Sequence, residues 1–175
     1  MILRPASFDD AASLAAFGRH AFVAAFGHCY ASSDLEPFLE KAYGEPAVRG
    51  EIANPWVRIQ LATQDDAIIG YCLMHLAAEW PEHARGQRPV TLHRLYVDPA
   101  RTGQAIGTEL MDWALCESRS HGADEVQLSV WSENSGAQRF YRRYGFEKVA
   151  DIDFWVTSHR DDEFLFSLHP LPCAA

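Results

Sequence analysis

The passage from an apolar strand into a helix at residues 95–107 constrains the fold more than any other stretch of this chain. Residues 90–97 are strand-like, and a turn containing Gly103 leads into residues 106–119, which have the apolar spacing of a helix. Small residues in such a turn let a ligand approach the backbone, and the free N–H groups and dipole at a helix start favour an anion. The turn predicts either a site for a nucleotide pyrophosphate or an ordinary loop.

The rest of the chain alternates between the periods of strands and helices. Strands are predicted at residues 1–4, 57–62, 67–76, 90–97, 126–131, from 146 onward and at 164–168, and helices at 8–28, 33–43, 106–119 and 134–144, with a short helical stretch at 47–52. Ser33 and Glu36 have the spacing of a capping box at the start of the second helix. Residues 80–89 show no periodicity and are predicted to form a loop long enough to be functional or mobile.

Length and composition favour one domain over residues 1–175, because 48% of the residues are hydrophobic and 22% are charged. No stretch reaches the roughly 18 apolar residues of a membrane span, so a cytoplasmic protein without a membrane partner is expected. The net charge of −9 disfavours nucleic acid and favours a cationic small molecule, although acidity also serves solubility alone. The cysteines lie far apart without C-x-x-C spacing, so no metal site and no disulfide framework are predicted.

Residues 102–107 resemble motif A of the Gcn5-related N-acetyltransferase (GNAT) superfamily, whose pattern Q/R-x-x-G-x-G/A lies between a strand and an amphipathic helix. The defining positions are occupied by Thr102, Ala105 and Gly107. Two of them depart from the pattern. Thr102 lacks a guanidinium or amide group, and Ala105 replaces a glycine but is small enough for a ligand to approach the backbone.

Residues 130–146 carry the closer resemblance. Their sequence is V-W-S-E-N-S-G-A-Q-R-F-Y-R-R-Y-G-F, and it matches the superfamily pattern V-x-x-x-N-x-x-A-x-x-F-Y-x-x-x-G-F at every fixed position. The predicted order of strands and helices agrees with the same superfamily. The resemblance implies an α/β acyl-CoA N-acyltransferase (GNAT) fold, with a mixed, mostly antiparallel sheet of about seven strands flanked by helices.

The resemblance also implies that acetyl-CoA is the co-substrate. The residues expected to contact it are Leu95, Tyr96, Val97, Thr102, Gly103, Gln104, Ala105, Ile106, Gly107, Thr108, Asn134, Tyr141 and Arg143. Asn134 also stands where a helix N-cap is expected, and the two roles are compatible. For Arg143 an ordinary solvated charge is the alternative.

Acetyl transfer to an amine needs a neutral nucleophile, stabilisation of an oxyanion and a proton for the leaving thiolate. By the resemblance, Tyr141 lies near the sulfur of coenzyme A and is the candidate general acid, and an ordinary core aromatic is the alternative. Backbone N–H groups of residues 95–97 are expected to bind the acetyl carbonyl and the pantetheine arm. His93 lies two residues before Leu95, so strand alternation places both on one face, and its imidazole is the candidate base. The alternatives are a structural histidine and bulk water as the base.

Residues outside the two motifs indicate which kind of amine is the acceptor. The segment F-G-H-C-Y at residues 26–30, with D-L at 34–35 and F-L at 38–39, resembles bacterial spermidine/spermine N-acetyltransferases. The first two helices usually form part of the acceptor pocket in this superfamily, so Asp34 and Glu36 are the candidate residues for binding a cationic substrate. The alternative is that both carboxylates only stabilise the dipole of their helix.

The sequence therefore predicts an N-acetyltransferase that moves the acetyl group of acetyl-CoA to a primary amine of a small molecule by direct attack in a ternary complex. A polyamine is the leading candidate acceptor, and an amino-acid derivative or a protein N-terminus is the alternative. An acetyl-CoA-binding sensor without turnover is the alternative function. A homodimer is compatible with the family, and closure of residues 80–89 over the acceptor is left open.

Overall fold

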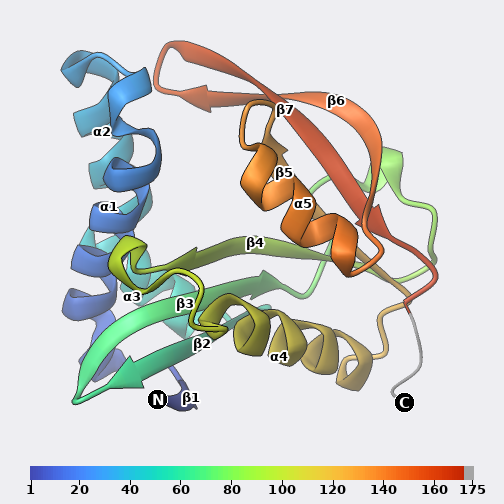
Figure 1. Ribbon diagram of the computed structural model, residues 1–175, viewed down its shortest axis with the longest axis horizontal. Coiled ribbons are helices and arrows are strands. Elements are labelled where there is room, and N and C mark those ends of the chain that lie inside the picture. The colour runs from blue at the N-terminus through green and yellow to red at the C-terminus, as the bar shows by residue number, and fades with distance from the viewer. Residues whose placement is uncertain (172–175) are drawn as a thin grey trace.

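A seven-stranded sheet forms the centre of the computed structural model, which describes residues 1–171 (Figure 1). The strand order is β1-β2-β3-β4-β5-β7-β6. The strands are β1 (Ile2–Pro5), β2 (Val57–Gln64), β3 (Ala67–His75), β4 (Pro89–Val97), β5 (Glu125–Trp131), β6 (Glu147–Val156) and β7 (His159–Leu168). β4 and β5 pair in parallel, and the other neighbouring pairs are antiparallel. The predicted mixed, mostly antiparallel α/β sheet is confirmed.

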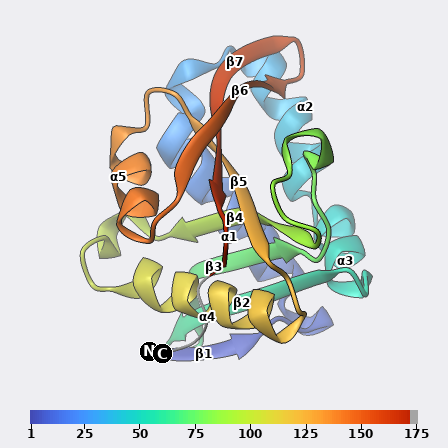
Figure 2. The same ribbon diagram turned by 90° about the vertical axis from the view of Figure 1, so that its right-hand side faces the viewer.

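Five α-helices within residues 1–171 cover the sheet, namely α1 (Ala11–Phe26), α2 (Ser32–Tyr43), α3 (Glu45–Ala53), α4 (Ile106–Ser120) and α5 (Ser135–Arg143). In Figures 1 and 2, α1 and α3 lie on one face of the half formed by β1–β4, and α4 lies on the opposite face. Leu110 of α4 is buried with Met74, whereas Leu14 of α1 is buried with Leu73. Neighbouring residues of β3 therefore serve two different cores, as strand alternation requires.

The start of the second helix differs from the prediction. α2 begins at Ser32 with Ala31 as its N-cap, so Ser33 lies inside the first turn and no capping box forms around it. A capping box forms elsewhere, between Ser7 and Asp10, before α1. The N-cap lies two residues before Ser33, the position that the S-x-x-E pattern indicated, so the Ser33 side chain cannot cap the helix.

Residues 80–89 are tied to the start of β5 through side-chain acceptors. The Glu125 carboxylate accepts hydrogen bonds from the backbone N–H groups of Arg85 (2.7 Å) and Gly86 (2.6 Å). The Asp124 carboxylate accepts from those of Gln87 and Arg88, both at 2.8 Å. The segment also contains a short 3-10 turn, Pro81–His83. Its backbone donors are thus satisfied by distant side chains, which explains why no period appears in its sequence.

β4 and β5 separate partway along their length. They pair only where Pro89, Val90 and Thr91 lie opposite residues 125–127. Beyond Thr91, β4 continues beside β3 alone, and β5 continues beside β7, so the two halves of the sheet turn away from one another (Figures 1 and 2). The edge of β4 over residues 92–97 is left without a strand partner on the side of β5.

A bulge lies in β4 at the point of separation. Met74 is opposite Leu92 and Leu73 is opposite Arg94, so His93 is the additional residue. Leu92 and Leu95 pack against the same buried cluster although they are three residues apart. The prediction that alternation places His93 and Leu95 on one face is therefore wrong, because the bulge interrupts the period of two.

Within residues 1–171 no helix has the length and apolar character needed to cross a membrane. Cys72 is buried, Cys29 is partly exposed and Cys116 is exposed, and all three are free thiols. Cys173 lies outside the described residues.

Candidate active site

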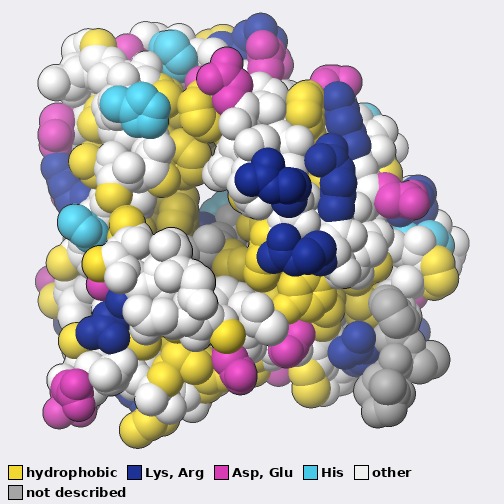
Figure 3. Space-filling model, viewed as in Figure 1, with side chains coloured by type: hydrophobic (Ala, Val, Ile, Leu, Met, Phe, Trp, Pro, Cys, Tyr) yellow, Lys and Arg dark blue, Asp and Glu magenta, His cyan; other side chains and the backbone are white. Residues whose placement is uncertain are grey.

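A cavity of about 1020 Å³ opens where β4 and β5 separate. Figure 3 shows the hollow, with hydrophobic side chains inside it. One end, called here the turn end, is lined by residues 101–103 and 105–108, together with Asn134 and Arg143. The other, called the aromatic end, is lined by Phe22, Phe26, Tyr30, Phe38, Trp131 and Phe154. The two ends belong to one continuous cavity but differ in chemistry.

Nearly all of the residues predicted to contact the cofactor line this cavity. Leu95, Tyr96, Val97, Thr102, Gly103, Ala105, Ile106, Gly107, Thr108, Asn134, Tyr141 and Arg143 line the cavity, and Gln104 does not. Gly103 (φ 80°) and Ala105 (φ 63°) both have left-handed backbone conformations. Glycine adopts this conformation freely, whereas alanine is strained in it. Ala105 is the N-cap of α4, so the strain falls where the helix start faces the cavity.

Positive charge gathers beside the turn end. α5 carries Arg139, Arg142 and Arg143, and Figure 3 shows Lys and Arg side chains over this helix at the border of the hollow. Arg101, from the 3-10 turn after β4, also lines the cavity. A helix start flanked by guanidinium groups is suited to phosphate groups.

Asn134 and Tyr141 are both positioned by α5, Asn134 as its N-cap and Tyr141 in its last turn. The Asn134 side chain accepts a hydrogen bond from the Ala137 backbone N–H at 3.0 Å, which caps the helix. Two helical turns later, Tyr141 lines the cavity. Burial raises the pKa of its phenol, and the nearby Cys72 and Glu163 raise it further. The phenol therefore stays protonated near neutral pH, which is the form that a proton donor needs.

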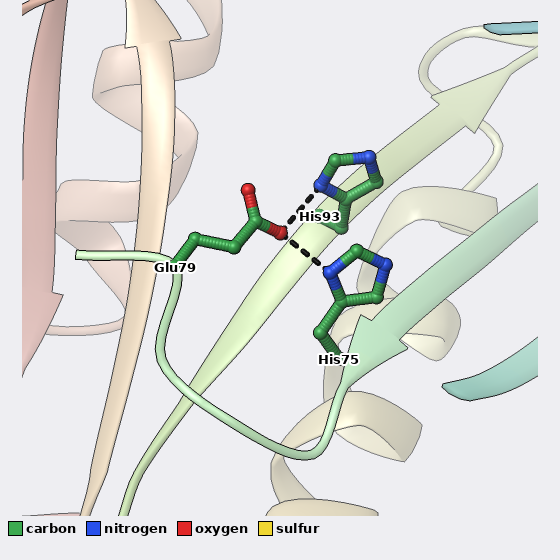
Figure 4. A group of neighbouring side chains, drawn as sticks. All are labelled: His75, Glu79 and His93. Carbon is green, nitrogen blue, oxygen red and sulfur yellow. Dashed lines mark hydrogen bonds and ion pairs between the residues drawn. The ribbon is translucent and has the colours of Figure 1, made fainter. Parts of the chain in front are cut away.

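His93 lies beside two residues that the sequence did not single out, His75 and Glu79 (Figure 4). The Nδ1 atoms of His75 and His93 each lie 2.6 Å from Oε1 of Glu79. The two imidazole rings stack with their centroids 4.3 Å apart. Burial alone would raise the pKa of the Glu79 carboxyl, but the hydrogen bonds and charges of the two histidines outweigh it and lower the pKa to about 2.

This contact fixes how His93 can act. A neutral His93 that donates its Nδ1–H to Glu79 keeps a free lone pair on Nε2, which points away from Glu79 in Figure 4. His93 and Glu79 both line the cavity. The sequence contained no clear signal for the group, because residues 75, 79 and 93 come together only through the β3–β4 pairing and its bulge.

Two carboxylates at the aromatic end were also missed. Asp161 is only 8% exposed, and it accepts a hydrogen bond from the Tyr30 hydroxyl. Oε2 of Glu163 is buried without a hydrogen-bond partner among residues 1–171. Burial raises the pKa of the Glu163 carboxyl to about 7, against the lowering effect of a hydrogen bond with Ser129. Both residues line the cavity from β7.

Asp34 and Glu36, the predicted acceptor-binding residues, are not among the residues that line the cavity. The Asp34 carboxylate accepts hydrogen bonds from the backbone N–H (3.0 Å) and hydroxyl (2.6 Å) of Ser158, which lower its pKa. Glu36 forms an ion pair with Arg19. Asp34 thus connects α2 to the turn between β6 and β7, and this hairpin carries Asp161 and Glu163 into the cavity.

The fold and the cavity define the class of protein: a sheet that separates between two parallel strands, next to a helix start suited to an anion, is the architecture of an acyl-CoA N-acyltransferase. The sequence profile described as "Acetyltransferase (GNAT) family" matches residues 19–146. The chain belongs to this family.

Relatives agree with the assignment. The chain is 25% identical over 159 residues to an uncharacterized N-acetyltransferase from the pepI 3' region of Lactobacillus delbrueckii, covering 91% of each chain. It is 26% identical over 155 residues to spermidine N(1)-acetyltransferase of Thermoplasma acidophilum, covering 86% of this chain and 90% of the relative.

Among solved structures, the PaiA N-acetyltransferase of Thermoplasma acidophilum in complex with coenzyme A shares the fold. Its TM-score is 0.76 at 22% identity, with 96% of this chain and 98% of that chain covered. The present protein is an acetyl-CoA-dependent N-acetyltransferase, as the sequence predicted.

Proposed function

We propose that this enzyme acetylates a primary amine of a small cationic molecule, with a polyamine such as spermidine as the leading candidate. The observation that carries the proposal is the buried Oε2 of Glu163, which lines the cavity without a hydrogen-bond partner among the described residues. A buried carboxylate oxygen without a partner is costly, and an ammonium group of the substrate would satisfy it. Asp161 and Glu79 add two further carboxylates to the same cavity.

The aromatic residues of this end support the same class of acceptor. Phe22, Phe38 and Tyr30 belong to one set of ring contacts, with centroid distances of 4.9 and 6.0 Å from Phe22 to the other two. Aromatic faces attract cations and also pack against methylene groups. A polyamine offers both cations and methylene groups, because its ammonium groups are separated by short apolar chains. Acetylation of spermidine at N(1) is the reaction named for the Thermoplasma acidophilum relative.

Acetyl-CoA is assigned to the turn end. In this proposal the pyrophosphate lies at the start of α4, near the guanidinium groups of Arg101 and Arg143, and the pantetheine arm follows the unpaired edge of β4. The small side chains of Gly103, Ala105 and Gly107 leave room for the ligand. Asn134 and Tyr141 then lie toward the thioester, between the two ends of the cavity.

The reaction is a direct transfer. The neutral amine nitrogen attacks the carbonyl carbon of the thioester, the new C–N bond forms, and the C–S bond breaks. His93 accepts the proton that leaves the nitrogen, since Glu79 holds its Nδ1–H and leaves Nε2 free. Tyr141 gives its proton to the departing thiolate. If this assignment of the base is right, His93→Ala moves the acidic limb of the pH profile of kcat/KM, and an unmoved limb would show that another group or water takes the proton.

The acceptor assignment is tested by thiol release from acetyl-CoA with a panel that contains spermidine, a monoamine of equal length and an amino-acid amide. Spermidine should be preferred. Asp161→Asn should raise its KM about tenfold, the effect of weakening one charged hydrogen bond, while the affinity for coenzyme A stays unchanged. Asp162→Asn is the matched control, because Asp162 is exposed and pairs with Arg160 outside the cavity. Equal rates for all three amines would contradict the assignment.

A further inference from the structure

His75, Glu79 and His93 form a group whose ligand atoms come from three elements: β3, the segment after it, and β4. One nitrogen from each histidine and one carboxylate oxygen lie within 4.8 Å of one another. Each of the three side chains is 29% exposed, so the group is open to small ions from solution. Figure 4 shows both Nδ1 atoms directed at the same point, which Oε1 of Glu79 now occupies.

The backbone holds the three residues in place without any ion. His75 lies opposite Thr91 in the β3–β4 pairing, and the bulge brings His93 beside it. The Glu79 backbone N–H donates to the Thr91 hydroxyl at 3.0 Å. The next residue, Trp80, accepts a hydrogen bond at its carbonyl from Gln127 of β5 at 3.2 Å. Such fixation of the ligand-bearing backbone lowers the ordering cost of binding an ion.

The donor set is one that transition metals prefer. Two imidazole nitrogens and a carboxylate oxygen are common ligands of Zn²⁺, with bonds of about 2.0–2.2 Å, and a fourth position is then left for water. Tetrahedral bonds of this length separate ligand atoms by about 3.4 Å. The present Nδ1–Oε1 distances of 2.6 Å would have to lengthen by roughly 0.8 Å, which rotation of the Glu79 side chain can supply.

We propose that His75, Glu79 and His93 form a binding site for a divalent transition-metal ion, with Zn²⁺ as the preferred ion. Zn²⁺ bound at Nδ1 of a neutral His93 leaves the ring proton on Nε2. His93 then has no free lone pair. Metal binding and the base role proposed for His93 therefore exclude each other, and Zn²⁺ is expected to act as an inhibitor.

Direct binding tests the site without reference to catalysis. The full chain, stripped of metal by a chelator and then freed of the chelator, is titrated with Zn²⁺ by calorimetry and with Co²⁺ by visible absorption. One equivalent of ion should bind, with the Co²⁺ spectrum of nitrogen and oxygen ligands. His75→Asn and Glu79→Gln should each weaken the affinity by at least about tenfold, because even changes to the neighbours of metal ligands cost about 10- to 100-fold.

Two variants serve as controls. His20→Asn removes an exposed imidazole of α1, and Cys116→Ser removes an exposed thiol of α4, and neither residue lines the cavity. Both should bind Zn²⁺ like the unchanged protein, and melting curves show that all variants are folded. Binding that survives His75→Asn, binding that is lost in Cys116→Ser, or no binding in the unchanged protein would each overturn the proposal.

The inhibition is a separate measurement that rests on the proposed function. Zn²⁺ should slow thiol release in the unchanged enzyme at the concentration at which it binds, and His75→Asn should need at least about tenfold more ion for the same inhibition. Binding without inhibition would contradict the base role of His93 and leave the metal site standing. Absence of binding would contradict the metal site and leave acetyl transfer untouched.

Discussion

The turn end and the aromatic end of the cavity are built in opposite ways. The turn end comes from a short run, residues 101–108, together with Asn134 and Arg143 at the two ends of α5, and most of the lining residues of that run are small. The aromatic end is assembled from α1, α2, β5, β6 and β7. Its chemistry comes from aromatic and acidic side chains of these elements. A local backbone site can bind one invariant group, whereas side chains from distant elements can change independently. This division suits a constant acetyl donor and an acceptor that differs between relatives.

The largest expected effect lies where the two ends meet. Tyr141→Phe removes the candidate proton donor while keeping the ring, so kcat should fall roughly 10- to 1000-fold with nearly unchanged affinity for coenzyme A. Steady-state thiol release and calorimetry measure the two quantities. Tyr144→Phe is the control, since Tyr144 lies on the same helix end but does not line the cavity. An unchanged kcat in Tyr141→Phe would remove Tyr141 from the mechanism.

The turn end should respond to the size of the side chain at Gly107. A Cβ on Gly107 would lie 3.7 Å from Val97 and 3.8 Å from Phe140, which is ordinary contact. Gly107→Ala should therefore fold and gain up to about 1 kcal/mol of stability from helix propensity. Because Gly107 lines the cavity, the same methyl group should weaken coenzyme A binding about tenfold.

Gly50→Ala is the matched control for this prediction. Gly50 lies in α3, and a Cβ there meets nothing within 4 Å. It should gain similar stability with no change in coenzyme A affinity, as measured by urea unfolding and calorimetry. Equal affinities of the Gly107→Ala variant and the unchanged protein would mean that the cofactor does not approach this helix start.

The aromatic end should carry a cost in stability that depends on pH. The pKa of the Glu163 carboxyl is about 7 in the folded protein, above its ordinary value of 4.5. The folded state therefore holds this proton more tightly than the unfolded state, and the associated stability is present below about pH 4.5 and is lost as the pH rises through 7. Glu163→Gln has no such loss.

Relative to the unchanged protein, Glu163→Gln should be more stable at pH 8 than at pH 5, as measured by urea midpoints at both values. Glu147→Gln on the neighbouring strand is the control, because its side chain is 75% exposed. A difference between variant and unchanged protein that is the same at both pH values would contradict the burial of the Glu163 carboxyl with an unpartnered Oε2 and weaken the acceptor assignment.

The smallest effect concerns the strained turn. Ala105→Gly should relieve the left-handed conformation at φ 63°, which costs alanine about 1–2 kcal/mol, but it also adds freedom to the unfolded chain. A net gain of about 0.5–1 kcal/mol in unfolding free energy is expected. Ala12→Gly, at an exposed position in α1, should instead lose about 1 kcal/mol. Loss of stability in both variants would show that the turn is not strained.

The same contrast explains how much could be predicted from the sequence. The order of strands and helices along the chain was accessible from the periods of two and 3.6. The turn end was accessible because residues 95–107 and 130–146 are contiguous, and their spacing reflects local geometry. The aromatic end was not. The run H-R-D-D-E at residues 159–163 has no hydrophobic alternation, so the first half of β7 was missed, and Asp161 and Glu163 with it.

The remaining differences also arise from contacts between distant residues. Asp34 and Glu36 were predicted to bind the acceptor because their helix usually lines the acceptor pocket in this superfamily. In the structure, the Asp34 carboxylate accepts a hydrogen bond from Ser158, and Glu36 forms an ion pair with Arg19. The group of His75, Glu79 and His93 depends on a bulge in β4. One extra residue in the pairing of two strands cannot be recognised from the pattern of apolar residues in the sequence.

A crystal structure with a coenzyme A–spermidine conjugate tests the central claim most directly, because one molecule then spans both substrates. The account predicts that the nucleotide lies at the start of α4 beside α5, that the sulfur lies near Tyr141, and that the polyamine chain lies among the aromatic residues with an ammonium group at Glu163 or Asp161. A polyamine chain that leaves the cavity, for example toward Glu36, would contradict it.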